Sequence, residues 1–184
     1  MEGFLPVVKD VFSIIGVLAA AYVFLLRREF YPRAQFNLSM RILGERENEV
    51  LVELEATVKN VGIVRHRIKS FTFSLRALEF GSPWAVNPEK NSLINFPRKV
   101  HGGDWVRRKY TTLVEPGVEQ KFNFVVNVSP ANVEYLNLYA NIAYRASWAP
   151  EHSAAITRSM SELKKKHIEV AQLQQGVANR PGIV

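Results

Sequence analysis

The feature that most constrains this chain is the long apolar run at its beginning. Between Phe4 and Leu26 the only charged residues are Lys9 and Asp10, and Arg27-Arg28 follow directly. As an α-helix the whole run would measure about 35 Å, more than the roughly 30 Å hydrocarbon layer of a bilayer. Lys9 and Asp10 would lie near one interface, where the lysine can extend toward the headgroups. The run therefore predicts a transmembrane helix over residues 4–26.

Two other interpretations of this run remain open. In a cleaved signal peptide, Ala19-Ala20-Ala21 would supply the cleavage site, but apolar residues continue beyond it and no basic residue precedes Lys9. A buried core helix of this length would rarely be apolar on every face. A retained membrane helix accounts best for the pattern. Within it, Gly16 and Ala20 are four residues apart, a spacing that lets a second helix approach closely.

The charges beside the run predict its orientation. Arg27, Arg28 and Arg33 follow it in a predicted juxtamembrane linker, residues 27–33, where they would anchor the helix at the headgroups. Basic residues are enriched on the cytoplasmic side of membrane proteins. We therefore expect the N-terminus outside and the rest of the chain in the cytoplasm, at a bacterial inner membrane.

The remainder of the chain alternates between apolar and polar residues, the pattern of half-buried strands. Turn residues separate the alternating stretches, and no helical pattern lies between them. Strands are predicted at 34–43, 50–59, 69–78, 105–114, 121–128 and 136–145, with a short edge strand around 92–96 and a last strand at 153–160. The fold class is therefore mainly β, an antiparallel β-sandwich over residues 34–160.

The end of the chain has a helical pattern instead. Within residues 161–175, Leu163, His167, Val170 and Gln174 recur along one side of a helix, and Gly176 is a stop signal. We expect a short C-terminal helix and tail over residues 161–184.

Two turns resemble those of a known class of domain. Asn60-Val61-Gly62 follows the second predicted strand, and Pro116-Gly117 precedes a strand with alternating phenylalanines. These features resemble bacterial immunoglobulin-like domains, in which strand B ends in such a turn and a Pro-Gly turn precedes strand E. The resemblance covers residues 34–160 and implies an immunoglobulin-like sandwich in a bacterial single-pass membrane protein. The cysteine pair of antibody domains is missing. Domains of this class mostly bind other molecules or serve as structural components.

The sequence offers little for catalysis. There is no cysteine, which excludes disulfides and thiol nucleophiles, and none of the four histidines has metal-ligand spacing. Asp10 and Asp104 are the only aspartates, and nucleophile-elbow, phosphate-loop and dinucleotide motifs are all missing. We expect no enzyme activity, cofactor, metal or small-molecule substrate. His101-Gly102-Gly103-Asp104 is the one stretch with a site-like composition, and it is otherwise predicted to be a turn.

The net charge of +7 points to anionic partners. Residues that would form a basic patch for lipid headgroups or an acidic protein surface are Arg65, Arg67, Arg98, Lys99, Arg107 and Arg108. The alternative is that they are ordinary solvated charges. No motif for nucleic acid accompanies them, so nucleic acid is not expected as a partner.

Together these features predict a non-catalytic, membrane-anchored accessory or scaffolding subunit of a larger membrane complex. Its transmembrane helix and sandwich would contact integral membrane proteins. The alternative is a free-standing sensor or binding module that recognises a ligand or peptide through the loops or the edge of its sandwich.

Overall fold

A computed structural model of the chain describes residues 10, 12–23, 33–83, 86–87, 93–106, 112–145 and 149–178. Residues 12–23 are helical, and each of them is exposed. Among the residues described, no helix combines the length and the apolar character that crossing a membrane requires. The rest of the predicted span 4–26, apart from Asp10, lies outside the described residues, as does the predicted linker except for Arg33.

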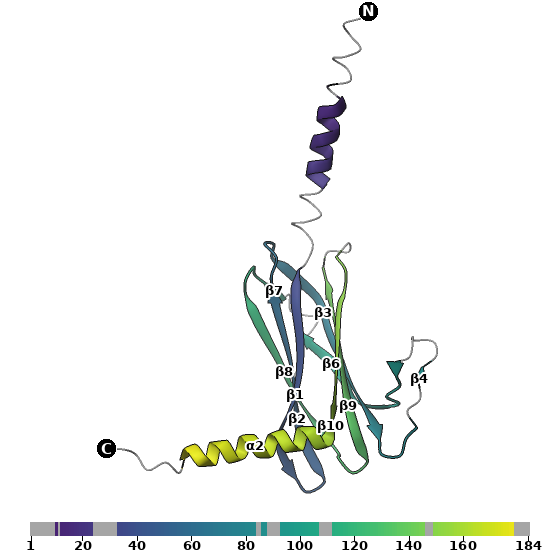
Figure 1. Ribbon diagram of the computed structural model, residues 1–184, viewed down its shortest axis with the longest axis vertical. Coiled ribbons are helices and arrows are strands. Elements are labelled where there is room, and N and C mark those ends of the chain that lie inside the picture. Colours follow the sequence, from purple (N-terminus) through teal and green to yellow (C-terminus); the bar gives the residue numbers. More distant parts are fainter. Residues whose placement is uncertain are drawn as a thin grey trace, which may run out of the picture.

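Two antiparallel sheets make up the body of the molecule, which confirms the mainly β prediction (Figure 1). The first sheet has the order β1 (Ala34–Arg46), β2 (Glu49–Asn60) and β8 (Glu119–Val128). The second has the order β10 (His152–Ser159), β9 (Val133–Tyr144), β3 (His66–Glu79) and β6 (Arg98–Val106), and β7 (Thr112–Val114) also pairs with β3. A separate small sheet joins β4 (Val86–Asn87) to β5 (Leu93–Ile94).

The apolar positions of the alternating stretches form one core between the two sheets. Phe71 on β3 is fully buried and lies at the centre of an aromatic group. Its ring is 5.6 Å from that of Phe36 on β1 and 5.1 Å from that of Phe122 on β8, both edge-on. The ring of Trp105 on β6 lies 4.7 Å away. Phe71 therefore connects the second sheet to two strands of the first.

The predictions for the middle of the chain were partly wrong. Of the expected strand at 105–114, residues 105–106 are the end of β6, which begins earlier at Arg98, and residues 112–114 are β7; both pair with β3, and 107–111 lie outside the described residues. The expected edge strand at 92–96 is reduced to β5, which pairs with β4 rather than with the sandwich. Pro88 and Pro97 flank the expected edge strand, and neither segment alternates clearly, so the local pattern identified neither the ends of these strands nor their partners.

The predicted turn at His101–Asp104 is also wrong, because these residues lie within β6. They pair with β3 from Leu75 to Thr72. The two glycines fit this close pairing: a Cβ at Gly102 would lie 3.3 Å from the carbonyl oxygen of Phe73. Glycine here marks a close approach of two strands rather than a reversal of the chain.

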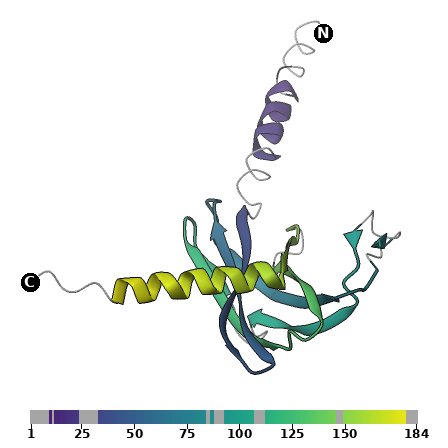
Figure 2. The same cartoon turned by 60° about the horizontal axis from the view of Figure 1, so that its bottom comes forward.

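The predicted last strand and C-terminal helix are present with small shifts, but Gly176 does not stop the helix, which continues to Ala178. Strand β10 ends at Ser159, and α2 (Met160–Ala178) begins with the next residue. The Ser159 hydroxyl accepts a hydrogen bond from the Glu162 backbone N–H at 3.1 Å, as a helix N-cap does. Helix α2 crosses one end of the sandwich, and its later part extends beyond the sheets (Figures 1 and 2).

A buried polar network closes the opposite end of the sandwich, where Arg33 leads into β1. Asn60 has no exposed surface, and its Nδ2 donates to the carbonyls of Val64 at 2.8 Å and Val114 at 2.9 Å. Its Oδ1 accepts from the Gly62 N–H at 2.9 Å. The predicted Asn-Val-Gly turn is therefore a loop fixed by one buried amide. A Cβ at Gly62 would lie 3.2 Å from that Oδ1, so the loop favours glycine.

His66 lies beside this network and is almost fully buried. Its Nε2 accepts a hydrogen bond from the Arg33 backbone N–H at 3.2 Å, so this ring nitrogen carries no proton. Its ring lies edge-on to Tyr144, 5.6 Å away. Burial, and secondarily the nearby His152, lowers the pKa of His66. Burial raises the pKa of Tyr144 to about 12.

Acidification is expected to destabilise the fold through His66. In the unfolded chain this residue has its ordinary pKa of about 6.5, while its pKa in the folded protein is lower. Its contribution to stability is therefore present above about pH 6.5 and is lost as the pH falls through the folded pKa. Melting temperatures should decrease more steeply with falling pH in the parent protein than in His66→Gln, which keeps an acceptor but does not titrate. Equal slopes would contradict this role for His66.

Candidate functional site

A groove lies between the edge strand β1 and the helix α2. Its volume is about 370 Å³. It is lined by Met40, Arg41, Ile42, Leu43, Leu163, Lys166, His167 and Val170. We call it the β1–α2 groove. Its floor is apolar, since Met40, Ile42 and Leu163 belong to the core.

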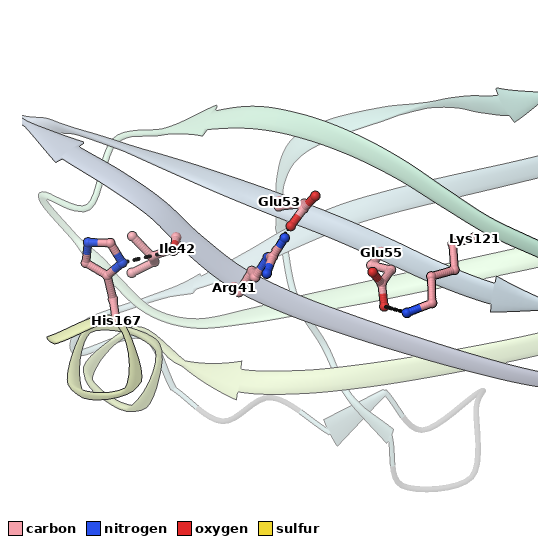
Figure 3. Close-up of polar contacts among 6 residues, drawn as sticks. All are labelled: Arg41, Ile42, Glu53, Glu55, Lys121 and His167. Atoms are coloured by element: carbon pink, nitrogen blue, oxygen red, sulfur yellow. Dashed lines mark hydrogen bonds and ion pairs between the residues drawn. The ribbon is translucent and has the colours of Figure 1, made fainter. Parts of the chain in front are cut away.

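The groove forms where the strand and the helix meet. The first turns of α2 bury Met160 and Leu163 against the sandwich. One turn later, the Nδ1 of His167 donates to the carbonyl of Ile42 at 3.0 Å (Figure 3). This nitrogen must carry the proton, because a carbonyl only accepts. The contact covers part of a sheet edge that would otherwise be open to another chain.

The charged side chains of the groove are cationic. Arg41 and Lys166 line it together with His167, and no carboxylate is among its lining residues. Each cation has a partner just outside: Arg41 pairs with Glu53 (Figure 3), and Lys166 pairs with Glu162 at 3.3 Å. The hydrogen bond with Glu53 raises the pKa of Arg41. The charged side chains that line the groove are therefore all cationic, and each of them already has an acidic neighbour just outside it.

At and beyond the outer end of the groove, α2 leaves the sandwich with apolar side chains uncovered. Ile168 is 55% exposed and Val170 is 53% exposed. The side of the helix that begins with buried Leu163 and continues through His167 thus reaches solvent at Val170. Apolar surface in this position is typical of contacts with another molecule.

The described members of the predicted basic patch are not all brought together. Arg65 and Arg67 lie at the start of β3, while Arg98 pairs in register with Ala77 near the other end of that strand. Arg65 forms an ion pair with Glu115 at 2.6 Å, and Arg98 forms one with Glu79 at 2.9 Å. The remaining members are Lys99, which is next to Arg98, and Arg107 and Arg108, which lie outside the described residues.

The other predicted site residues are placed only in part. Gly16 and Ala20 lie in the exposed helix 12–23. A Cβ at Gly16 would meet nothing within 4 Å, which leaves room for another helix to approach. Arg33 is exposed at the start of β1, and Arg27 and Arg28 lie outside the described residues.

His101 and Asp104 do not converge. Residues three apart in a strand point to opposite faces of its sheet. His101 stacks on Phe73 with ring centres 5.9 Å apart, and it also lies 5.3 Å from Phe124. Asp104 is exposed. Among the described residues, no group of three or more histidine, cysteine or acidic side chains gathers as a metal site would require.

Sequence reasoning missed the groove. The only trace of the groove in the sequence is the helical spacing of Leu163, His167 and Val170, which predicts one side of the helix. That spacing does not indicate on which strand the helix packs. The β1 half has no distinctive motif. Two elements more than a hundred residues apart form it together.

No family model matches the chain, and no curated protein is similar to it in sequence. Several solved structures show a partial likeness to this chain. The putative ApaA protein from Bordetella pertussis is 9% identical over 71% of this chain and 95% of that chain, with a TM-score of 0.46. The sporulation control protein Spo0M from Bacillus subtilis is 11% identical over 67% of this chain and 47% of that chain, with a TM-score of 0.40.

A β-glucuronidase from Bacteroides uniformis is also similar, with 10% identity over 70% of this chain but only 14% of the enzyme, and a TM-score of 0.45. Because all three identities are low and all three scores lie below 0.5, we draw no functional conclusion from these likenesses.

Proposed function

We propose that the protein is a non-catalytic, membrane-anchored accessory subunit that holds its sandwich beside an integral membrane partner. The exposed helix 12–23 is the observation that carries this proposal. Phe12 is 70% exposed, Val17 is 69% exposed and Leu18 is 64% exposed. A contiguous apolar surface of this kind needs a cover. Lipid is the cover that fits, because the apolar run continues in the sequence to residues 4–26 and ends at Arg27-Arg28.

The strand order supports the immunoglobulin-like description. Strands β1, β2 and β8 correspond in position to A, B and E of such a sandwich. Strands β3, β9 and β10 correspond to C, F and G. The Pro116-Gly117 turn precedes β8, the equivalent of strand E. Domains of this architecture commonly serve in binding, which agrees with an accessory role.

The β1–α2 groove is the surface on which the partner would dock. Its apolar floor and cationic rim suit a short segment that carries both apolar and acidic side chains. We assign it to a segment of the integral partner on the same side of the bilayer as the sandwich. We expect that side to be the cytoplasm, because basic residues follow the apolar run. Exposed Val170 would be covered by that contact.

Site-specific photo-cross-linking in native membranes tests this assignment. A photoreactive amino acid in place of Val170 should form an adduct with an integral membrane protein. Tyr139 is the matched control, because it is 45% exposed but lies on β9, away from the groove. A Val170→Glu substitution should weaken the adduct formed from Ile168, since it adds a carboxylate where an acidic partner would lie. Equal adducts from Val170 and Tyr139 would argue against the groove.

The anchor has its own test. The full chain should remain in the membrane pellet after alkaline carbonate extraction and should float with vesicles after reconstitution. Release of the protein into the supernatant would contradict the proposal that it is anchored in the membrane. Purification as a lone monomer in mild detergent, without cross-links in native membranes, would remove the accessory role.

A further inference from the structure

The end of the sandwich opposite α2 has an unusual surface. We call it the Arg33 end; it consists of Arg33, the loop at 61–65 and the turn at 115–118. The Arg33 carbonyl accepts a hydrogen bond from the Val61 N–H at 2.8 Å, which fixes where the chain joins the sandwich. From Leu26 to Arg33 the chain can span at most about 25 Å. If residues 4–26 cross the bilayer, as the proposed function holds, this end lies close to the headgroups.

Apolar side chains project from both the loop and the turn. Ile63 is 67% exposed, Val61 is 47% exposed and Val118 is 40% exposed. Backbone hydrogen bonds tie the two segments together, from the Asn60 N–H to the Val118 carbonyl at 3.1 Å and from the Gly117 N–H to the Asn60 carbonyl at 2.8 Å. The three apolar side chains therefore belong to one rigid surface.

Arginines surround this apolar surface. Arg33, Arg65, Arg67 and Arg145 are exposed at this end of the sandwich, which also carries three carboxylates, those of Glu115, Glu119 and Glu151. Arg65 is paired with Glu115, but Arg33 and Arg67 form no ion pair among the described residues. In the sequence, Arg27-Arg28 adds further positive charge to the segment that leads to this end. Exposed apolar side chains beside unpaired arginines are the composition of surfaces that lie at a membrane interface.

We infer that the Arg33 end docks directly on an anionic lipid surface. Ile63, Val61 and Val118 would reach the boundary between headgroups and acyl chains, and Arg33 and Arg67 would contact phosphates. Continuity with the apolar run favours lipid over a protein partner, because the chain's own anchor keeps this end at the bilayer. Docking would hold the sandwich upright, with its strands pointing away from the membrane and α2 at the far end.

Single labels on the full chain can test this contact, since the protein has no native cysteine. Val61→Cys and Leu51→Cys form a matched pair: the parent residues are 47% and 46% exposed and occupy opposite ends of the β2 region. Each variant would carry an environment-sensitive fluorophore, in nanodiscs of phosphatidylcholine alone or mixed with phosphatidylglycerol. We expect a blue shift and quenching by spin-labelled lipid at residue 61, and at Ile63→Cys, but not at residue 51. Arg67→Glu should reduce the effect of phosphatidylglycerol.

The outcomes separate this inference from the anchor. Chains that insert into nanodiscs but show the same water-like emission at residues 61, 63 and 51 would overturn lipid docking and leave the anchor intact. A label at residue 63 that is shielded in native membranes but not in nanodiscs would assign the surface to a protein, which also overturns it. Failure to insert would overturn the anchor and this inference together.

Discussion

Replacing Phe71 by alanine is expected to lower the free energy of unfolding by about 3–5 kcal/mol, the usual cost of removing a buried aromatic ring. The ring has no exposed surface and contacts Phe36, Trp105 and Phe122, which come from three different strands. The cavity would thus open between the two sheets. Chemical denaturation in detergent, followed by tryptophan fluorescence, would measure the loss.

Phe71→Leu provides the graded control for this prediction. It keeps most of the apolar volume and should cost clearly less than the alanine variant. At the surface, Phe80→Ala removes a ring that is 67% exposed and should leave stability nearly unchanged. Similar losses for Phe71→Ala and Phe80→Ala would show that the aromatic group does not join the sheets.

Replacing Asn60 by aspartate is expected to cost at least about 2 kcal/mol, even though the two side chains have almost the same size. Aspartate could still accept from the Gly62 N–H, but it would turn an oxygen toward the carbonyls of Val64 and Val114 in place of a donor. The loop at 61–65 would lose the bonds that hold it. Thermal melts would measure the stability, and hydrogen exchange would locate the loss in this loop.

Asn127→Asp is the matched control, since Asn127 is exposed on β8 and the same chemical change should have little effect there. The Asn60 variant also bears on membrane contact, because it loosens the loop that presents Ile63. In nanodiscs we expect a weaker lipid signal from residue 63 in this background. An unchanged melting temperature for Asn60→Asp would mean that the buried amide does not organise the Arg33 end.

Period-two alternation was enough to predict most strands of the two sheets. In β2, Val52, Leu54, Ala56 and Val58 are all buried as their spacing predicts. The same is true of Phe71, Phe73, Leu75 and Ala77 in β3. Such strands identify themselves because one face meets the core along their whole length.

The sequence could not predict features that depend on pairing between distant segments. Strand β6 has exposed residues along most of its length and two glycines in its middle, so it has no clean alternation, and only its pairing with β3 defines it. The β1–α2 groove likewise depends on the direction in which α2 leaves β10. The basic residues near Arg65 and those near Arg98 are separated by the length of β3. The number of basic residues in the sequence does not reveal this separation.

The two ends of the sandwich chain lie in different sheets, and this determines how the domain would respond to mechanical load. Strand β1 receives the chain at the Arg33 end, and β10 passes it to α2 at the other end, with no linker between strand and helix. A pull between a fixed anchor and a partner that moves α2 would act along the strands. The hydrogen bonds of the β1–β2 and β9–β10 ladders would then share the force in shear instead of opening one after another. The sandwich is thus connected so that it can transmit tension along its strands, over the roughly 43 Å length of β1, without unzipping.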